Sequence, residues 1–77
     1  MHEHRANVVI HVDEALTIGR MQELERSLGA EEGVISACVS DRATHLMVVD
    51  FDADAVSAAE LLHRVELEGV HAELIGL

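Results

Sequence analysis

The chain has 77 residues and a formal net charge of −10, because 15 acidic residues outnumber five Lys and Arg residues. Apolar residues make up 49% of the chain, and Phe51 is its only aromatic residue. We expect one globular domain over residues 6–77, with an aliphatic core, after a flexible tail over residues 1–5. The negative charge and the lack of aromatic stacking surfaces exclude nucleic acid as a partner. No apolar run is long enough to span a membrane, so we expect a cytoplasmic protein.

The first predicted elements are a strand over residues 6–12 and a helix that stops at Gly29. Apolar β-branched residues fill every second position of the strand: Val8, Ile10 and Val12. This period of two is typical of a strand with one buried face. In the helix, apolar residues recur at helical spacing: Met21, Leu24 and Leu28. Thr17 is the predicted N-cap, because a start at Asp13 would put Gly19 inside the helix at a cost of about 1 kcal/mol.

Two strands and a second helix follow Gly33. The strands are predicted over residues 34–40 and 46–51, joined by a hairpin loop of four or five residues. Ser57 and Glu60 have the spacing of a capping box, which predicts the start of the second helix. Its expected buried stripe is Leu61, Leu62, Val65 and Leu67, and Gly69 is its expected end. A last strand is predicted over residues 70–75.

This order of elements predicts an α+β fold, a ferredoxin-like βαββαβ sandwich. Its four-stranded antiparallel sheet carries the two helices on one face. Right-handed crossovers place the first and third strands in the middle, the fourth beside the first and the second beside the third. One edge of the molecule then gathers the end of the first strand, the hairpin and the start of the last strand.

Three segments, GVISACVS, VVDFD and SAAELLHRVELEGVHAEL, together resemble the heavy-metal-associated domain of small copper chaperones and metal-transporting ATPases. The resemblance runs from Ala6 to Leu74 and implies the same fold and a role in metal transport. That family binds metal at a G-M-x-C-x-x-C loop after its first strand, and the spacing places its two cysteines at Thr17 and Arg20. A hydroxyl and a guanidinium cannot replace two soft thiolates, so the family's Cu(I) site cannot be transferred.

Histidine and carboxylate side chains are the alternative metal ligands. His11 ends the first strand on the face away from the helices, and we expect His71, at the start of the last strand, to be its cross-strand neighbour. Glu73 points the same way, and His45 closes the hairpin. Such a set suits Zn(II), Cu(II), Ni(II) or Fe(II) rather than Cu(I). The competing interpretation is that these are ordinary polar residues of an open sheet face.

Five other residues have more than one interpretation. His2 and His4 lie two apart near the N-terminus, where they either chelate Cu(II) or form part of a solvated tail. Cys38, the only cysteine, either ligates metal or forms a disulfide between two chains, or is a small apolar filler in a strand. Met21 and Met47 fall on core-facing positions, which favours packing over thioether ligation.

The exposed side of the sheet is a predicted interaction surface. Apolar side chains point away from the helices there: Val9, Leu46, Val48 and Ile75. Such a strip is typical of a partner or homodimer surface, and the two edge strands could add a strand from a second copy. Catalysis is not expected, because the polar cluster of Ser36, Ser40, Asp41 and His45 flanks an exposed hairpin without a pocket.

Two hypotheses of function follow from the sequence. In the first, the chain carries, buffers or senses a transition metal through histidine and carboxylate ligands. It would pass the ion to a metal-transport or redox protein with a basic surface. In the second, it is an interaction module that resembles the heavy-metal-associated domain but binds no metal.

Overall fold

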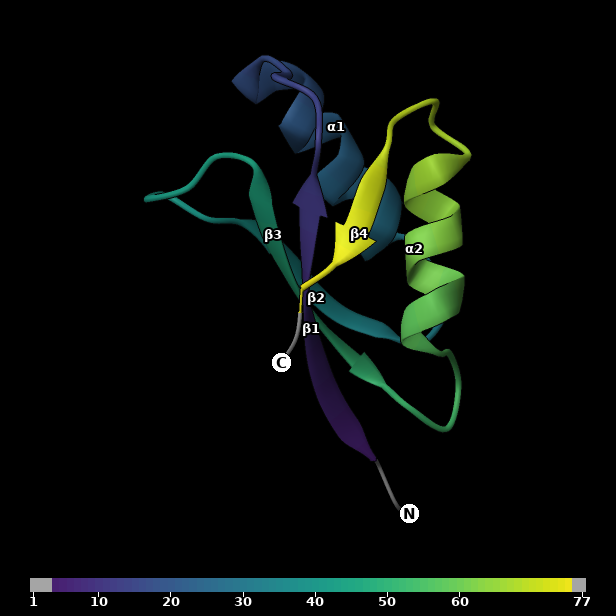
Figure 1. The fold of residues 1–77 in the computed structure, drawn as a ribbon. Helices are drawn as coiled ribbons and strands as arrows, with labels where there is room; N and C mark the ends of the chain where they lie inside the picture. Colours follow the sequence, from purple (N-terminus) through teal and green to yellow (C-terminus); the bar gives the residue numbers. More distant parts are fainter. Residues whose placement is uncertain (1–3, 76–77) are drawn as a thin grey trace.

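The fold is a two-layer sandwich with the predicted order of strands. The structure, a computed structural model, describes residues 4–75. Its elements are β1 (Arg5–Val12), α1 (Ile18–Gly29), β2 (Val34–Val39), β3 (Leu46–Asp52), α2 (Ala58–Glu66) and β4 (Ala72–Leu74). The strands form one antiparallel sheet in the order β2-β3-β1-β4 (Figure 1). This confirms the ferredoxin-like topology. No helix within residues 4–75 has the length and apolar character needed to cross a membrane.

The core lies between the sheet and the helices. It is built from alternate residues of β1 and β3, the inner stripes of α1 and α2, and two connecting valines: Val8, Ile10, Val12, Met47, Val49, Phe51, Met21, Leu24, Leu28, Leu61, Val65, Val56 and Val70. Burying one such side chain contributes about 1.5 to 3 kcal/mol, so this cluster carries most of the stability. Met21 and Met47 are therefore packing residues, as predicted. Leu67 is 63% exposed, because α2 ends at Glu66 and the predicted stripe stops with it.

Both helix starts follow the predicted capping chemistry. Thr17 is the N-cap of α1, and its Oγ1 accepts a hydrogen bond of 3.1 Å from the Arg20 N–H. Ser57 and Glu60 form the capping box of α2. α1 ends at Gly29, where the sequence predicted its stop, and Ala30 is its C-cap. The left-handed backbone occurs later, at Gly33, where a Cβ would lie 2.9 Å from the side chains of Ala55 and Val56.

The chain connections also refine the predicted boundaries. Ser40 donates its N–H to the Leu46 carbonyl, so the hairpin loop is residues 41–45. β4 is shorter than the expected strand over residues 70–75. At the other end, β1 begins at Arg5, and the His4 carbonyl accepts a hydrogen bond of 2.7 Å from the Ala53 N–H. His4 and Arg5 therefore belong to the fold rather than to a tail.

Candidate metal centre

Three connections meet at one end of the sheet, which we call the rim: the β1–α1 loop, the β2–β3 hairpin and the α2–β4 connection. They lie at the upper end of the molecule in Figure 1. The Val12 N–H donates to the His45 carbonyl and the Asp13 N–H to the His71 carbonyl, each at 2.8 Å. The predicted gathering of these segments is therefore confirmed.

The possible ligand atoms of three side chains converge at the rim. His11, Asp13 and Glu73 each offer one ligand atom, and these atoms lie within 4.8 Å of one another. His11 and Glu73 are directly opposite in the register of β1 and β4. Asp13 follows His11 by two residues, and its Oδ1 lies 3.0 Å from the His11 Nδ1. The side chains of His11 and Asp13 are 37% and 47% exposed, so an ion can reach them from solvent.

The expected pairing of His11 with His71 is wrong. The register places Glu73 opposite His11, whereas His71 precedes β4 and lies beside Asp13. The His71 ring is 83% exposed and its Nδ1 lies 3.6 Å from Glu14 Oε2. The partners in an antiparallel pair of strands follow from the register. The assumed register was two residues off, so it placed His71 opposite His11, where the structure has Glu73.

His45 lies near this group without belonging to it. Its ring centroid is 6.3 Å from that of His11, and the two rings are tilted by 38°. Sequence reasoning missed Asp13, because we considered that residue only as a helix cap. The signal was present in the spacing of His11 and Asp13, since residues two apart along an extended chain share a face.

Thr17 and Arg20 are both engaged in the fold. Thr17 caps α1, as described above. The Arg20 guanidinium donates to the Glu68 carbonyl at 2.6 Å and lies 3.2 Å from Glu23 Oε1 and 3.4 Å from Glu68 Oε1. The two positions that the sequence resemblance assigns to metal ligands thus order the start of α1 and attach it to the segment that follows α2.

The remaining histidine and cysteine candidates lie away from the group. His4 Nδ1 is 2.8 Å from Asp54 Oδ1, and this hydrogen bond, followed by the charges of Asp54 and Asp52, raises the pKa of His4 above its ordinary value of 6.5. His2 lies outside the described residues. Cys38 is exposed on β2 as the register partner of Val48, and its sulfur forms no disulfide within the chain.

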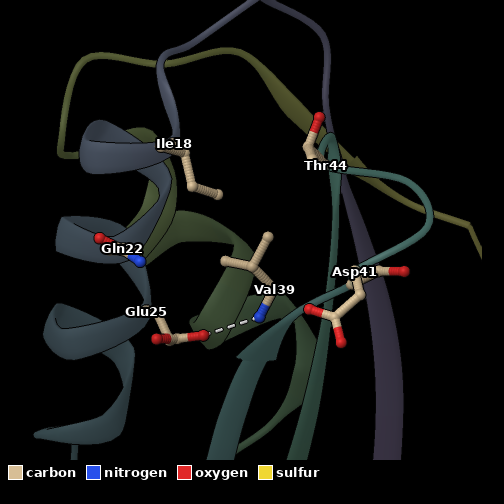
Figure 2. A pocket seen from close by; sticks show the side chains of 7 residues that line it. Ile18, Gln22, Glu25, Val39, Asp41 and Thr44 are labelled. Atoms are coloured by element: carbon tan, nitrogen blue, oxygen red, sulfur yellow. Dashed lines mark hydrogen bonds between the residues drawn. The ribbon is translucent and has the colours of Figure 1, made fainter.

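A groove of about 230 Å³ lies between the N-terminal half of α1 and the hairpin (Figure 2). It is lined by Ile18, Gln22, Glu25, Val39, Ser40, Asp41 and Thr44. The Val39 N–H donates across it to Glu25 Oε2 at 2.7 Å. This bond occupies one backbone donor of the β2 edge, so an added strand would have to displace Glu25 there. The groove is separate from the group of His11, Asp13 and Glu73.

The open face of the sheet carries an apolar strip that crosses β2, β3 and β1 and reaches Ile75, just after β4. The register aligns Val9 with Val48 and Val48 with Cys38, and the Ile75 N–H donates to the Val9 carbonyl. Val48 and Ile75 are 41% and 48% exposed, which agrees with the predicted orientation of this strip away from the helices.

Comparison with known proteins identifies relatives of this fold. No protein-family model and no curated protein matches the chain. Among solved structures, the N-terminal domain of a potential copper-translocating P-type ATPase from Bacillus subtilis, in the Cu(I)-loaded state, matches with a TM-score of 0.83 and 21% identity over 94% of this chain and 89% of that one. A copper-binding domain of another P-type ATPase matches with a TM-score of 0.81 and 21% identity, covering 91% and 93% of the two chains. Oxidized MerP from Ralstonia metallidurans CH34 gives 0.80 and 20%, covering 91% and 96%.

Proposed function

We propose that the chain is a heavy-metal-associated-like domain that binds a divalent transition metal ion at the rim. The observation that carries this proposal is the convergence of ligand atoms from His11, Asp13 and Glu73 within 4.8 Å. One imidazole nitrogen and two carboxylate oxygens suit Zn(II), Cu(II) or Ni(II). The role would be metal carriage, buffering or sensing.

The likeness to metal-handling domains supports this use of the fold. Two of the similar structures are described as a copper-binding domain and as a Cu(I)-loaded domain. This chain has one cysteine, so a pair of thiolates from one chain is not available for Cu(I). We infer that a harder nitrogen and oxygen ligand set takes the place of paired sulfur.

The geometry of the group favours exchange of the ion over permanent retention. Three ligands leave at least one coordination position open, in contrast to closed structural zinc sites. The net charge of −10 attracts cations to the protein and favours a partner with a basic surface, such as a metal-transport or redox protein. An ion bound at the exposed rim would be accessible to that partner.

Titration of the untagged protein with Zn(II), followed by calorimetry and by NMR of the imidazole and amide signals, tests the proposal. We expect one site, with shifts confined to the rim, and binding at least about tenfold weaker in His11→Ala and in Asp13→Asn, because each substitution removes a ligand. Binding should also weaken as the pH falls, since protons compete with the ion for the imidazole nitrogen.

His71→Ala and His63→Ala are the matched controls. His71 precedes β4 and His63 lies on α2; both are exposed and lie outside the group, so zinc affinity should stay within about twofold of the wild type. The proposal fails if micromolar Zn(II), Cu(II) and Ni(II) all leave the rim signals unchanged. It also fails if His71→Ala weakens binding as much as His11→Ala does.

The second candidate function, an interaction module without metal, is favoured by the apolar strip of Val9, Val48, Cys38 and Ile75. A strip of this kind on an open sheet face is typical of a docking surface. This function predicts indifference to metal in the titration above, together with an association that depends on the strip.

A further inference from the structure

The position of Glu73 depends on the register of a very short strand. β4 has three residues and pairs with β1 through Ile10 and Leu74, His11 and Glu73, and Val12 and Ala72. A shift of β4 by two residues would keep its side chains on the same faces, but it would bring His71 opposite His11. Two further backbone bonds extend this pairing, from the Ile75 N–H to the Val9 carbonyl and from the Asp13 N–H to the His71 carbonyl. A pairing this short at a sheet edge specifies its register weakly, so contacts outside the strand help to select it.

The Arg20 guanidinium fixes the chain before β4. It donates to the Glu68 carbonyl at 2.6 Å and to Glu68 Oε1 at 3.4 Å, and the Ser27 hydroxyl donates to Glu68 Oε2 at 3.4 Å. The Arg20 side chain is 30% exposed, so these bonds are partly shielded from water. Glu68 is thereby attached to α1 from both its backbone and its side chain.

Few residues separate this anchor from the proposed ligand. Gly69 turns the chain with a φ of 89°, and Val70 is buried. The His71 N–H donates to Glu14 Oε1 at 2.9 Å, and the His71 carbonyl accepts from the Asp13 N–H. The segment from Glu68 to His71 is thus held at both ends, which leaves Ala72 and Glu73 little freedom to shift.

From these contacts we infer that Arg20 is a positioning residue that selects Glu73, rather than His71, as the neighbour of His11. This inference rests on the proposed metal site. Arg20 touches none of the three ligands, and it acts through Glu68 on the start of β4. It would therefore determine whether the rim presents one histidine with two carboxylates or two neighbouring histidines.

Electrostatics and positioning predict opposite effects for Arg20→Ala. Removing a positive charge from the protein should, by Coulomb's law alone, strengthen Zn(II) binding. Loss of the register should weaken it, and we expect about a tenfold or larger rise in the dissociation constant. Arg20→Lys keeps the charge but loses the two-pronged donation to Glu68, so we expect a smaller rise.

The control is Arg64→Ala, which removes a positive charge and the contact of 3.2 Å between Arg64 Nε and Glu31 Oε2. Because that contact joins α2 to the segment before β2, zinc affinity should stay equal to the wild type or become slightly tighter. An equal weakening in Arg20→Ala and Arg64→Ala would show a general loss of stability and overturn the proposal. If Arg20→Ala fails to fold, Arg20→Lys decides the same question.

The register itself gives a measurement that needs no metal. The wild type should show NMR contacts between the backbones of Val12 and Ala72, which are register partners, and slow exchange of the Asp13 amide. Both should be lost in Arg20→Ala, and their persistence would overturn the proposal. If the wild type binds no zinc, the proposed function fails on its own, and these two signals alone decide whether Arg20 sets the register.

Discussion

At the residue scale, His4 connects the start of β1 to the segment between β3 and α2. Its ring bonds Asp54 and its carbonyl accepts from the Ala53 N–H. The hydrogen bond to Asp54 is the main cause of the raised pKa of His4, followed by the Asp54 and Asp52 charges, while desolvation lowers the pKa. Because the folded state holds the proton more tightly than the unfolded state, protonation of His4 stabilises the fold.

This linkage predicts a pH-dependent effect of Asp54→Asn. The stabilisation is complete below the ordinary pKa of 6.5 and disappears as the pH rises through the raised pKa of the folded state. Urea unfolding should therefore show a deficit for Asp54→Asn at pH 6 that shrinks by pH 8. The deficit should be small because both side chains are exposed. Asp41→Asn, on the hairpin, is the control, and a deficit that is the same at both pH values would contradict this assignment.

At the element scale, the start of α1 depends on Thr17. Its Oγ1 satisfies the Arg20 N–H, and the first turn of α1 contains no acidic residue that could serve the same purpose. The β1–α1 loop therefore ends at a helix N-cap, Thr17. This is the position that the sequence resemblance aligns with a cysteine of the heavy-metal-associated domain.

Thr17→Ala should lower the free energy of unfolding by about 1 kcal/mol, because loss of the hydroxyl would leave the Arg20 N–H without its partner. Thr17→Ser retains the hydroxyl and should recover most of this loss. Chemical unfolding of the three proteins at one pH measures the difference. Equal losses in the alanine and serine variants would show that the methyl group, rather than the hydroxyl, stabilises the helix start.

At the scale of the whole molecule, charge and the apolar strip have opposing effects on association. A net charge of −10 makes copies of the chain repel one another, whereas the strip on the open face favours contact. Added salt screens repulsion over roughly 10 Å at 0.1 M and leaves apolar attraction in place. Salt should therefore favour any association through this face.

For the interaction-module function, light scattering should show a mass that rises with protein concentration, and rises further with salt. Val48→Asp should abolish the rise by placing a charge in the strip. Ile18→Asp is a matched control, because Ile18 is 56% exposed on α1, outside the strip. A constant monomer mass in all three proteins would argue against self-association, and an equal effect of both substitutions would exclude a specific role of the open face.

Local chemistry made much of the fold predictable from the sequence. Alternating Val8, Ile10 and Val12 identified a half-buried strand, and the Thr17 and Ser57 caps identified the helix starts, because each signal depends on residues within one or two turns. The order of elements then led to the observed sheet, since right-handed crossovers leave few arrangements. These features were determined by the sequence itself.

The candidate site required the tertiary structure. His11 and Glu73 were predicted as ligands from their faces, but which residue of β4 lies opposite His11 depends on a register that no local pattern specifies. Contacts between distant segments decide it: Arg20 holds Glu68, and Glu14 holds His71. Because these contacts exist only once α1, α2 and β4 have packed together, the sequence determined His11 and Glu73 as candidates, and the packed fold decided that they meet and that Asp13, rather than His71, completes the group.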